Sequence, residues 1–341
     1  MNKIRKSFTV VILLFCGVFL PLSAWDYTGH RIVNRLALAG LPQGFPSFVA
    51  APDASERILF LGGEPDRFRN SPEYTFLHVA NTDHYFDIEY LPLHGLDPVK
   101  ISPFRYDFAV AFAAARTSHP GAIPGLDKQR NRDHTREWPG FLPWAITENY
   151  ARLSSAFSYL AAYRRYGTPT EIANAEASVI YYMGVLGHYA GDAAQPLHTT
   201  KHFNGWTGDN PKAYTTARSF HQLIDGGYIE KSDITAEKML PRALTARIYS
   251  TNVDSEGRPG IFSEAMRFIE HNNDLVEPLY ALEKTGAFTN AGNTGAKEFI
   301  DARLYAAGEF LSSLWRTAYE TAPPDTYLLK HLEQRKTAAG K

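Results

Sequence analysis

Two pairs of histidine and aspartate residues, each four positions apart, have the side chains and the spacing to bind a metal ion. His188 and Asp192 form the first pair, and His221 and Asp225 form the second. Residues four apart in a helix project from the same face, so each pair could present an imidazole and a carboxylate together. His198 lies between the pairs. Imidazole nitrogens and carboxylate oxygens suit zinc, so this part of the chain predicts a zinc site.

A solvated surface is the alternative explanation for such pairs. A histidine and an aspartate one helical turn apart are more often a surface ion pair than a metal site. Two such pairs on either side of His198 are less easily explained as solvated helix faces. We therefore favour metal binding.

The first 24 residues have the pattern of a secretory signal peptide. Lys3, Arg5 and Lys6 precede an apolar run over 8–22, and Leu22-Ser23-Ala24 offers a small-residue cleavage site. A membrane anchor is the alternative, although the apolar run is short for a spanning helix. We therefore expect a periplasmic or secreted protein.

Cleavage after Ala24 would make Trp25 the new N-terminus and give it a free α-amine. An α-amine with a pKa of about 8 can lose its proton to a metal ion, and together with its own carbonyl oxygen it forms a small chelate. Trp25 is therefore a candidate ligand through its backbone. His30 is a candidate ligand through its side chain, although it could also be an ordinary histidine at the start of a helix.

Two further candidate ligands, Asp66 and His84, lie before the histidine pairs. Asp66 follows a glycine turn at the start of a helix, where an aspartate would normally be a cap. As a metal ligand, it would have Arg67 or Arg69 positioned beside it for a phosphate oxygen. Asp87 follows His84 closely in the sequence and could orient a metal ligand by a hydrogen bond on the side away from the metal.

Composition restricts the classes of function. The chain has 35 basic and 36 acidic residues, and removal of the three basic residues of the signal peptide leaves 32 against 36. This balance would not by itself attract a polyanion, so attraction for phosphate would depend on bound metal.

The only cysteine, Cys16, lies in the signal peptide, so the mature protein would have no disulfide. The His-Glu-x-x-His motif does not occur, which disfavours a metalloprotease.

Helices must position these residues. Before the first pair, apolar residues recur at three- and four-residue steps and predict a helix over 171–194: Ile172, Ala175, Val179, Met183 and Leu186. Pro196 disfavours helical geometry at Gln195 and predicts the end of this helix. Other long helices are predicted from 141 onward and over 297–320. No strand alternation of convincing length occurs, so the sequence predicts an all-α fold.

The predicted organisation is a single domain. It extends over 25–322 and follows the signal peptide at 1–24. Segment 91–143 is rich in proline, glycine and charge and predicts a surface insertion that could cover the site. Segment 323–341 is expected to be a frayed tail.

These residues together resemble the superfamily of trinuclear-zinc phosphoesterases. It includes bacterial zinc-dependent phospholipases C and the single-strand-specific zinc nucleases of the S-one and P-one type. The resemblance covers most of the mature chain and implies an all-α fold with the site in a cleft among long helices. It also implies three zinc ions: Asp66, His84, His188 and Asp192 would hold the first, His198, His221 and Asp225 the second, and Trp25, His30 and a bridging Asp192 the third.

Three details are similar to the nuclease branch: the short interval from Trp25 to His30, the long interval from His198 to His221, and aspartate rather than glutamate at 225. Asn210, in Thr207-Gly208-Asp209-Asn210, is the nearest counterpart of the glycine-glycine-asparagine stretch of the nucleases and is an expected substrate contact. The cysteine pairs of the family have no counterpart here.

The resemblance implies hydrolysis of a phosphodiester in single-stranded nucleic acid or a nucleotide. Zinc lowers the pKa of a bound water from about 16 toward 7. Asp66 could orient or deprotonate the attacking water, and Arg69 or Arg67 could neutralise the phosphate. The alternatives are a phospholipase C that acts on phospholipid headgroups and a non-catalytic exported zinc-binding protein. No stable membrane insertion is expected after removal of the signal peptide.

Overall fold

The computed structural model describes residues 26–121, 126–290 and 292–339. The expected signal peptide and Trp25 lie outside these described residues. Within them the chain is helical and contains no β-strand, and only two isolated bridges pair extended backbone. The prediction of an all-α fold is confirmed. None of the helices in the described part of the chain is both long and apolar enough to span a membrane.

Fifteen α-helices follow one another along the described residues, with loops and short 3-10 segments between them. Their bounds are α1 Tyr27–Ala39, α2 Pro52–Leu61, α3 Glu64–Phe68, α4 Tyr74–Thr82, α5 Tyr90–Leu93, α6 Arg105–Ser118, α7 Leu142–Tyr166, α8 Pro169–Ala194, α9 Ser219–Gln222, α10 Tyr228–Lys231, α11 Ala236–Met239, α12 Gly260–Asn273, α13 Val276–Lys284, α14 Thr294–Thr321 and α15 Thr326–Ala339. A π-helical turn, Leu223–Gly227, joins α9 to α10.

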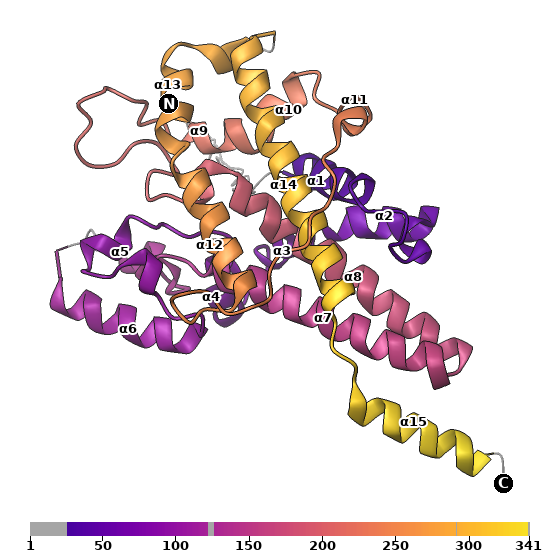
Figure 1. The fold of residues 1–341 in the computed structure, drawn as a ribbon. Helices are drawn as coiled ribbons and strands as arrows, with labels where there is room; N and C mark the ends of the chain where they lie inside the picture. Colours follow the sequence, from indigo (N-terminus) through magenta and orange to yellow (C-terminus); the bar gives the residue numbers. More distant parts are fainter. Residues whose placement is uncertain (1–25, 122–125, 291, 340–341) are drawn as a thin grey trace, which may run out of the picture.

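The long helices α7, α8 and α14 form the centre of the molecule together with α1. Helices α7 and α8 run side by side, and α14 packs against both of them and against α1 (Figure 1). At the start of α8, Thr168 and Glu171 form a capping box, and Pro169 takes the first helical position. On α14, the buried Trp315 donates its indole N–H to the carbonyl of Met183 on α8 at 3.2 Å. The expected packing of long helices in one domain is therefore confirmed.

A glycine allows α2 to pack closely against α8. A Cβ atom at Gly184 would lie 2.4 Å from Cβ of Leu61, so a larger residue would force the two helices apart. Because α2 leads directly into α3, this contact also holds α3 against α8. The turn between α2 and α3 is thereby placed next to the end of α8.

The predicted boundaries agree with the structure for the longest elements. Helix α8 begins two residues before the predicted 171 and ends before Pro196, as expected. In the segment at 91–143, α6 buries Phe108 and Phe112, and the Phe108 ring stacks on Trp144 with centroids 4.3 Å apart. This segment therefore contributes to the hydrophobic core as well as to the surface.

The C-terminal segment differs from the expectation of a frayed tail. Residues 326–339 form α15, which packs against α7. Its Leu332 is buried, and Arg335 forms an ion pair with Glu171 of α8 at 2.7 Å. The tail expectation is wrong for this helix because these contacts attach it to neighbours that are distant in sequence.

Candidate metal centre

Eight of the nine expected metal ligands lie together in the structure. They form three groups in which one ligand atom from each residue lies within 4.8 Å of the others: His30, His188 and Asp192; Asp66, His84 and His188; and His198, His221 and Asp225. The ninth expected ligand, Trp25, lies outside the described residues. The fold thus contains three largely buried histidine and aspartate groups that could hold metal ions.

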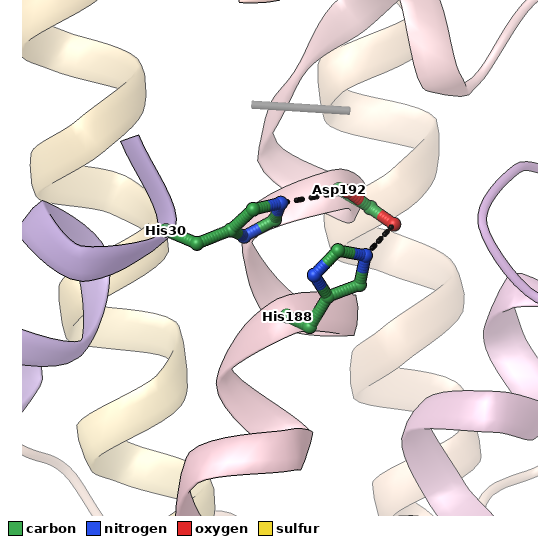
Figure 2. Close-up of side chains that lie close together, drawn as sticks. All are labelled: His30, His188 and Asp192. Atoms are coloured by element: carbon green, nitrogen blue, oxygen red, sulfur yellow. Dashed lines mark ion pairs between the residues drawn. The ribbon is translucent and has the colours of Figure 1, made fainter. Parts of the chain in front are cut away.

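Helices α1 and α8 position the first group (Figure 2). His188 and Asp192 lie one turn apart on α8, and His30 projects toward them from α1. His30 Nε2 lies 3.6 Å from Asp192 Oδ1, and His188 Nε2 lies 3.3 Å from Asp192 Oδ2. The two imidazole rings stack with centroids 3.9 Å apart. All three side chains are fully buried.

Helix α3 and the end of α4 add Asp66 and His84 to the centre. His84 Nδ1 lies 2.9 Å from His188 Nε2 and 3.9 Å from Asp66 Oδ1. Two nitrogens that bind one tetrahedral zinc at about 2.05 Å lie roughly 3.3 Å apart, so these histidines could share an ion after a small movement. Asp66 does not cap α3, because Gly63 is the N-cap residue. Its carboxylate is 17% exposed, more than any other ligand in the described chain, and marks the open side of the centre.

The third group lies on the short helices after residue 195. His198 ends a 3-10 turn, His221 lies on α9, and Asp225 lies on the π-helical turn. His221 Nε2 is 3.1 Å from His198 Nε2 and 2.6 Å from Asp225 Oδ2. Asp225 Oδ1 is 3.7 Å from His198 Nε2. Three donor atoms therefore converge on one point from three separate turns.

Asp192 connects the groups because its two oxygens face different histidines. Oδ1 lies 3.6 Å from His30 Nε2 and 4.0 Å from His198 Nδ1. Oδ2 lies 3.1 Å from His84 Nδ1 and 3.3 Å from His188 Nε2. A carboxylate in this position could contribute one oxygen to each of two metal ions.

Backbone carbonyl groups orient two of the histidines. His188 Nδ1 lies 2.7 Å from the carbonyl oxygen of Gly62, and His198 Nδ1 lies 2.8 Å from that of His84. A neutral histidine that donates Nδ1–H to a carbonyl leaves Nε2 as an acceptor, which is the common arrangement behind metal-binding histidines. In the neutral form of each ring, Nε2 is therefore available to the centre. The sequence does not reveal these partners, because any residue can supply a carbonyl oxygen.

Gln195 supports Asp225 in a role that the sequence did not suggest. The buried Gln195 side chain donates Nε2–H to Asp225 Oδ1, and its Oε1 accepts the backbone N–H of Leu197 at 2.7 Å. Asp26 also contacts this segment, because its backbone N–H donates to the carbonyl oxygen of Asp225 at 3.0 Å. The start of the described chain and the end of α8 therefore meet at the same ligand.

Burial and charge shift the pKa values of the ligands in different directions. Burial lowers the pKa of His30 well below its usual value and lowers the pKa of His84 to about 3. Burial also opposes protonation of His198, but Asp192 and Asp225 outweigh it and raise the pKa of His198 to about 9. Against the effect of burial, neighbouring histidines hold the pKa of Asp192 well below its usual value. A buried, ionised carboxylate among imidazoles is an environment that favours a cation.

The donor atoms of the centre fit a metal ion. Within the described residues, hydrogen-bond partners are lacking for both ring nitrogens of His30, for His84 Nε2 and for Asp192 Oδ1, all of which are buried. A buried polar atom without a partner costs about 1–3 kcal/mol. Coordination would satisfy one nitrogen of His30 and the Asp192 oxygen, and a set of imidazole and carboxylate donors is typical of a first-row transition metal site.

The two candidate arginines differ in position. Arg69 Nη1 lies 3.5 Å from Asp66 Oδ1, on the open side of the centre. Arg67 instead forms an ion pair with Glu64 at 2.6 Å and lies over the ring of Phe60 at 3.9 Å from its centroid. Arg69 is therefore the better placed of the two to meet a phosphate oxygen.

Two other expected residues have different surroundings from those predicted. The Asn210 amide exchanges two hydrogen bonds of 2.8 Å with the backbone of Tyr214, so it stabilises its own loop. Asp87 is buried, and burial raises its pKa well above the usual value. Among the described residues Asp87 Oδ1 has no hydrogen-bond partner, so that oxygen does not hold His84.

No protein-family model matches the chain, and no curated protein matches it.

Proposed function

We propose that this protein is an exported zinc-dependent phosphodiesterase that hydrolyses single-stranded nucleic acid. The observation that carries the proposal is the position of Asp192, whose two oxygens face different histidines inside a buried site. A shared carboxylate is the arrangement expected of adjacent metal ions. Centres with more than one metal ion stabilise both the attacking and the leaving oxygen in phosphoryl transfer.

The composition of the donor set supports zinc. Five histidines and three aspartates make up the described groups. Zinc accepts nitrogen and carboxylate ligands, whereas magnesium and calcium prefer oxygen ligands alone. The contact between Asp26 and Asp225 is also relevant, because cleavage after Ala24 would create a new α-amine one residue before Asp26. That amine is the proposed ninth ligand.

Asp66 and Arg69 would act on the substrate. When bound, zinc would activate a water molecule and neutralise the phosphoryl group. Burial raises the pKa of Asp66, which suits it to accept the proton that the attacking water loses. Arg69 would donate hydrogen bonds to a non-bridging phosphate oxygen. The preference for nucleic acid over lipid rests on the similarity of the ligand spacing to the nuclease branch.

A substrate panel tests this proposal on the leader-cleaved, zinc-loaded protein. The panel consists of a single-stranded oligodeoxynucleotide, bis(4-nitrophenyl) phosphate and phosphatidylcholine vesicles. We expect hydrolysis of the first two and no release of phosphocholine from the third. Protein that retains its leader is the matched control and should turn over more slowly, because its Trp25 nitrogen is in a peptide bond.

Two results would overturn the proposal. Hydrolysis of the vesicles without cleavage of the oligodeoxynucleotide would identify a phospholipase C. Full zinc content without turnover of any of the three substrates would identify a non-catalytic zinc-binding protein.

A further inference from the structure

Arg136 presents a guanidinium group that the fold leaves exposed. It lies on a 3-10 turn, Thr135–Glu137, shortly before α7. Arg130, in the same segment, pairs with Asp127 at 3.5 Å, whereas Arg136 has no ion-pair partner within the described residues. An arginine without a carboxylate partner keeps its charge and its N–H donors available for an external anion.

The carboxylates on either side of Arg136 in the sequence are already engaged. Asp133 accepts a 2.9 Å hydrogen bond from the Asn81 amide, and Glu137 Oε1 lies 2.8 Å from His134 Nδ1. Both contacts hold a carboxylate oxygen against another group. They explain why neither Asp133 nor Glu137 neutralises the arginine between them.

Tyr85 connects the 3-10 turn to the metal centre. It follows the candidate ligand His84 directly in the sequence, and its hydroxyl donates to the carbonyl oxygen of Thr135 at 3.2 Å. Thr135 is the residue before Arg136. One side chain therefore links the backbone beside a metal ligand to the backbone beside the exposed guanidinium group.

Backbone hydrogen bonds hold the end of this segment against the chain that carries Tyr85. The N–H of Leu142 donates to the carbonyl of Tyr85 at 3.2 Å, and the N–H of Asp87 donates to the carbonyl of Pro139 at 2.6 Å. Between them, Gly140 has a φ of +99°, and a Cβ atom there would lie 1.9 Å from the carbonyl oxygen of Tyr85. The fold thus fixes the 3-10 turn relative to the centre.

Arg69 and Arg136 share the surroundings of Tyr85. Burial raises the pKa of Tyr85, and the positive charges of Arg69 and Arg136 both oppose that rise. Arg69 also lies 3.5 Å from Asp66, the most accessible metal ligand among the described residues. A path of contacts therefore runs from the open side of the centre through Arg69 and Tyr85 to Arg136.

A second approach to the centre has the wrong charge for a phosphate chain. A cavity of about 570 Å³ opens beside Asp225, between the start of α1 and the α9–α10 segment. Apart from that ligand, its charged lining consists of Asp26, Glu230 and Glu283 against the single cation Lys231. A polyanion would be repelled there, so the side with Asp66 and the two arginines is the more favourable approach.

We propose that Arg136 binds a second phosphate of a single-stranded substrate, next to the phosphate that Arg69 meets at the metal centre. This inference rests on the proposed function and adds a binding subsite to it. A guanidinium group donates paired hydrogen bonds to phosphate oxygens, and contacts of this kind position a strand without reading its sequence. The subsite would make the enzyme prefer polynucleotides to diesters that contain one phosphate.

Two matched strands and one small diester test the proposal on the zinc-loaded protein. The first strand is a twelve-nucleotide oligodeoxythymidylate. The second has the same bases, but only its central linkage is a phosphodiester and the others are uncharged methylphosphonates. The small substrate is bis(4-nitrophenyl) phosphate. Initial rates give kcat and KM for each substrate, and stopped-flow anisotropy of fluorescein-labelled strands gives binding whether or not cleavage follows.

Arg136→Ala should raise KM for the charged strand roughly tenfold and leave kcat unchanged, because the contact is the same in the ground state and the transition state. KM for the other two substrates should change by less than about twofold. The slope of log affinity for the charged strand against log salt should fall by about 0.7. Arg136→Lys keeps the charge and should retain most of this salt dependence.

Arg130→Ala is the matched control, because Arg130 is an exposed arginine of the same segment that already has a carboxylate partner. It should change KM for the charged strand by less than about twofold. Zinc content and urea unfolding of both variants should equal those of the parent protein. These measurements separate a phosphate contact from a loss of structure.

Three outcomes would overturn the subsite: an unchanged KM for the charged strand in Arg136→Ala, an equal loss of the charged and the methylphosphonate strands, and an equal effect of Arg130→Ala. Failure of the proposed function is distinguishable from these. It would abolish cleavage of both strands in the parent protein, whereas selective loss of charged-strand binding in Arg136→Ala would still appear in the anisotropy.

Discussion

Gly187 on α8 packs against Asn34 on α1 so closely that a Cβ atom at Gly187 would lie 1.7 Å from Asn34 Oδ1. Asn34 cannot easily move away, because its amide donates a 2.8 Å hydrogen bond to the carbonyl of Ile58. Gly187 precedes His188, and Asn34 lies one turn after His30. The contact therefore sets the distance between the two helices at the point where their histidines meet.

Gly187→Ala should separate α1 from α8 and weaken metal binding at His30. Overpacking at such a contact costs about 1–3 kcal/mol of unfolding free energy. Urea unfolding and elemental analysis of the purified variant measure the two effects. Gly295→Ala is the matched control. Its Cβ would lie 3.5 Å from the nearest atom, Asn293 Oδ1, so the substitution should change stability by no more than about 1 kcal/mol. Parent-like stability and full metal content in Gly187→Ala would contradict the argument.

Asp192→Asn should lose metal and activity together. The substitution keeps the size of the side chain but replaces a charged oxygen with an amide group that binds metal poorly. Because the two oxygens face different histidines, we expect loss of more than one equivalent of zinc. Substitution of a residue that only hydrogen-bonds to a metal ligand typically lowers activity roughly 10- to 100-fold, and we expect a larger fall in kcat/KM here. Elemental analysis and phosphodiester hydrolysis measure both. Asp233→Asn, at an exposed aspartate, is the control, and full zinc content in Asp192→Asn would refute the bridging role.

Gln195→Ala should weaken metal binding without removing a ligand. The variant leaves Asp225 Oδ1 without this donor and the backbone N–H of Leu197 without its acceptor, at about 1–3 kcal/mol for each buried group. Zinc affinity should fall roughly 10- to 100-fold. Competition with a chromogenic chelator measures the affinity. Gln222→Ala, at an exposed glutamine on α9, should leave it unchanged, and an equal effect of both variants would show that Gln195 has no special role.

The elements and the histidine pairs could be predicted from the sequence because their signals are local. The apolar spacing and Pro196 are sufficient to predict α8 and its end. Helical geometry alone places His188 and Asp192 on one face, without knowledge of the rest of the fold. The pair His221 and Asp225 has the same spacing, although the structure places Asp225 on a π-helical turn rather than in a regular helix.

The surroundings of the ligands could not be predicted because they depend on packing between distant segments. The carbonyl of Gly62 meets His188 only because α2 packs against α8. Gln195 has no pattern in the sequence that distinguishes it from a surface glutamine. Likewise, α15 has a weak apolar pattern, and its attachment depends on partners on α7 and α8 that are far away in the sequence.

The metal-free protein should lose stability between about pH 6.5 and pH 9, and zinc should gain affinity over the same range. Asp192 and Asp225 outweigh burial and raise the pKa of His198 from 6.5 to about 9. A histidine with a raised pKa in the folded state contributes stability that is fully present below its unfolded pKa and is lost as the pH rises through the folded pKa. His30 and His84, whose pKa values are lowered, act with the opposite sign and only below this range.

Zinc competes with the proton on His198, so its affinity should rise until that proton is lost near pH 9. Urea unfolding from pH 6 to pH 9.5, with and without zinc, measures the stability, and chelator competition measures the affinity. His198→Gln is the informative variant, because it keeps a polar side chain of similar length but does not titrate. Burial lowers the pKa of His188, but Asp192 and Asp66 outweigh it and raise that pKa too, so His188 contributes to the same decline. His198→Gln should therefore reduce the decline in the metal-free protein, whereas a metal-free stability that increases with pH across this range would contradict the assignment of a proton to His198.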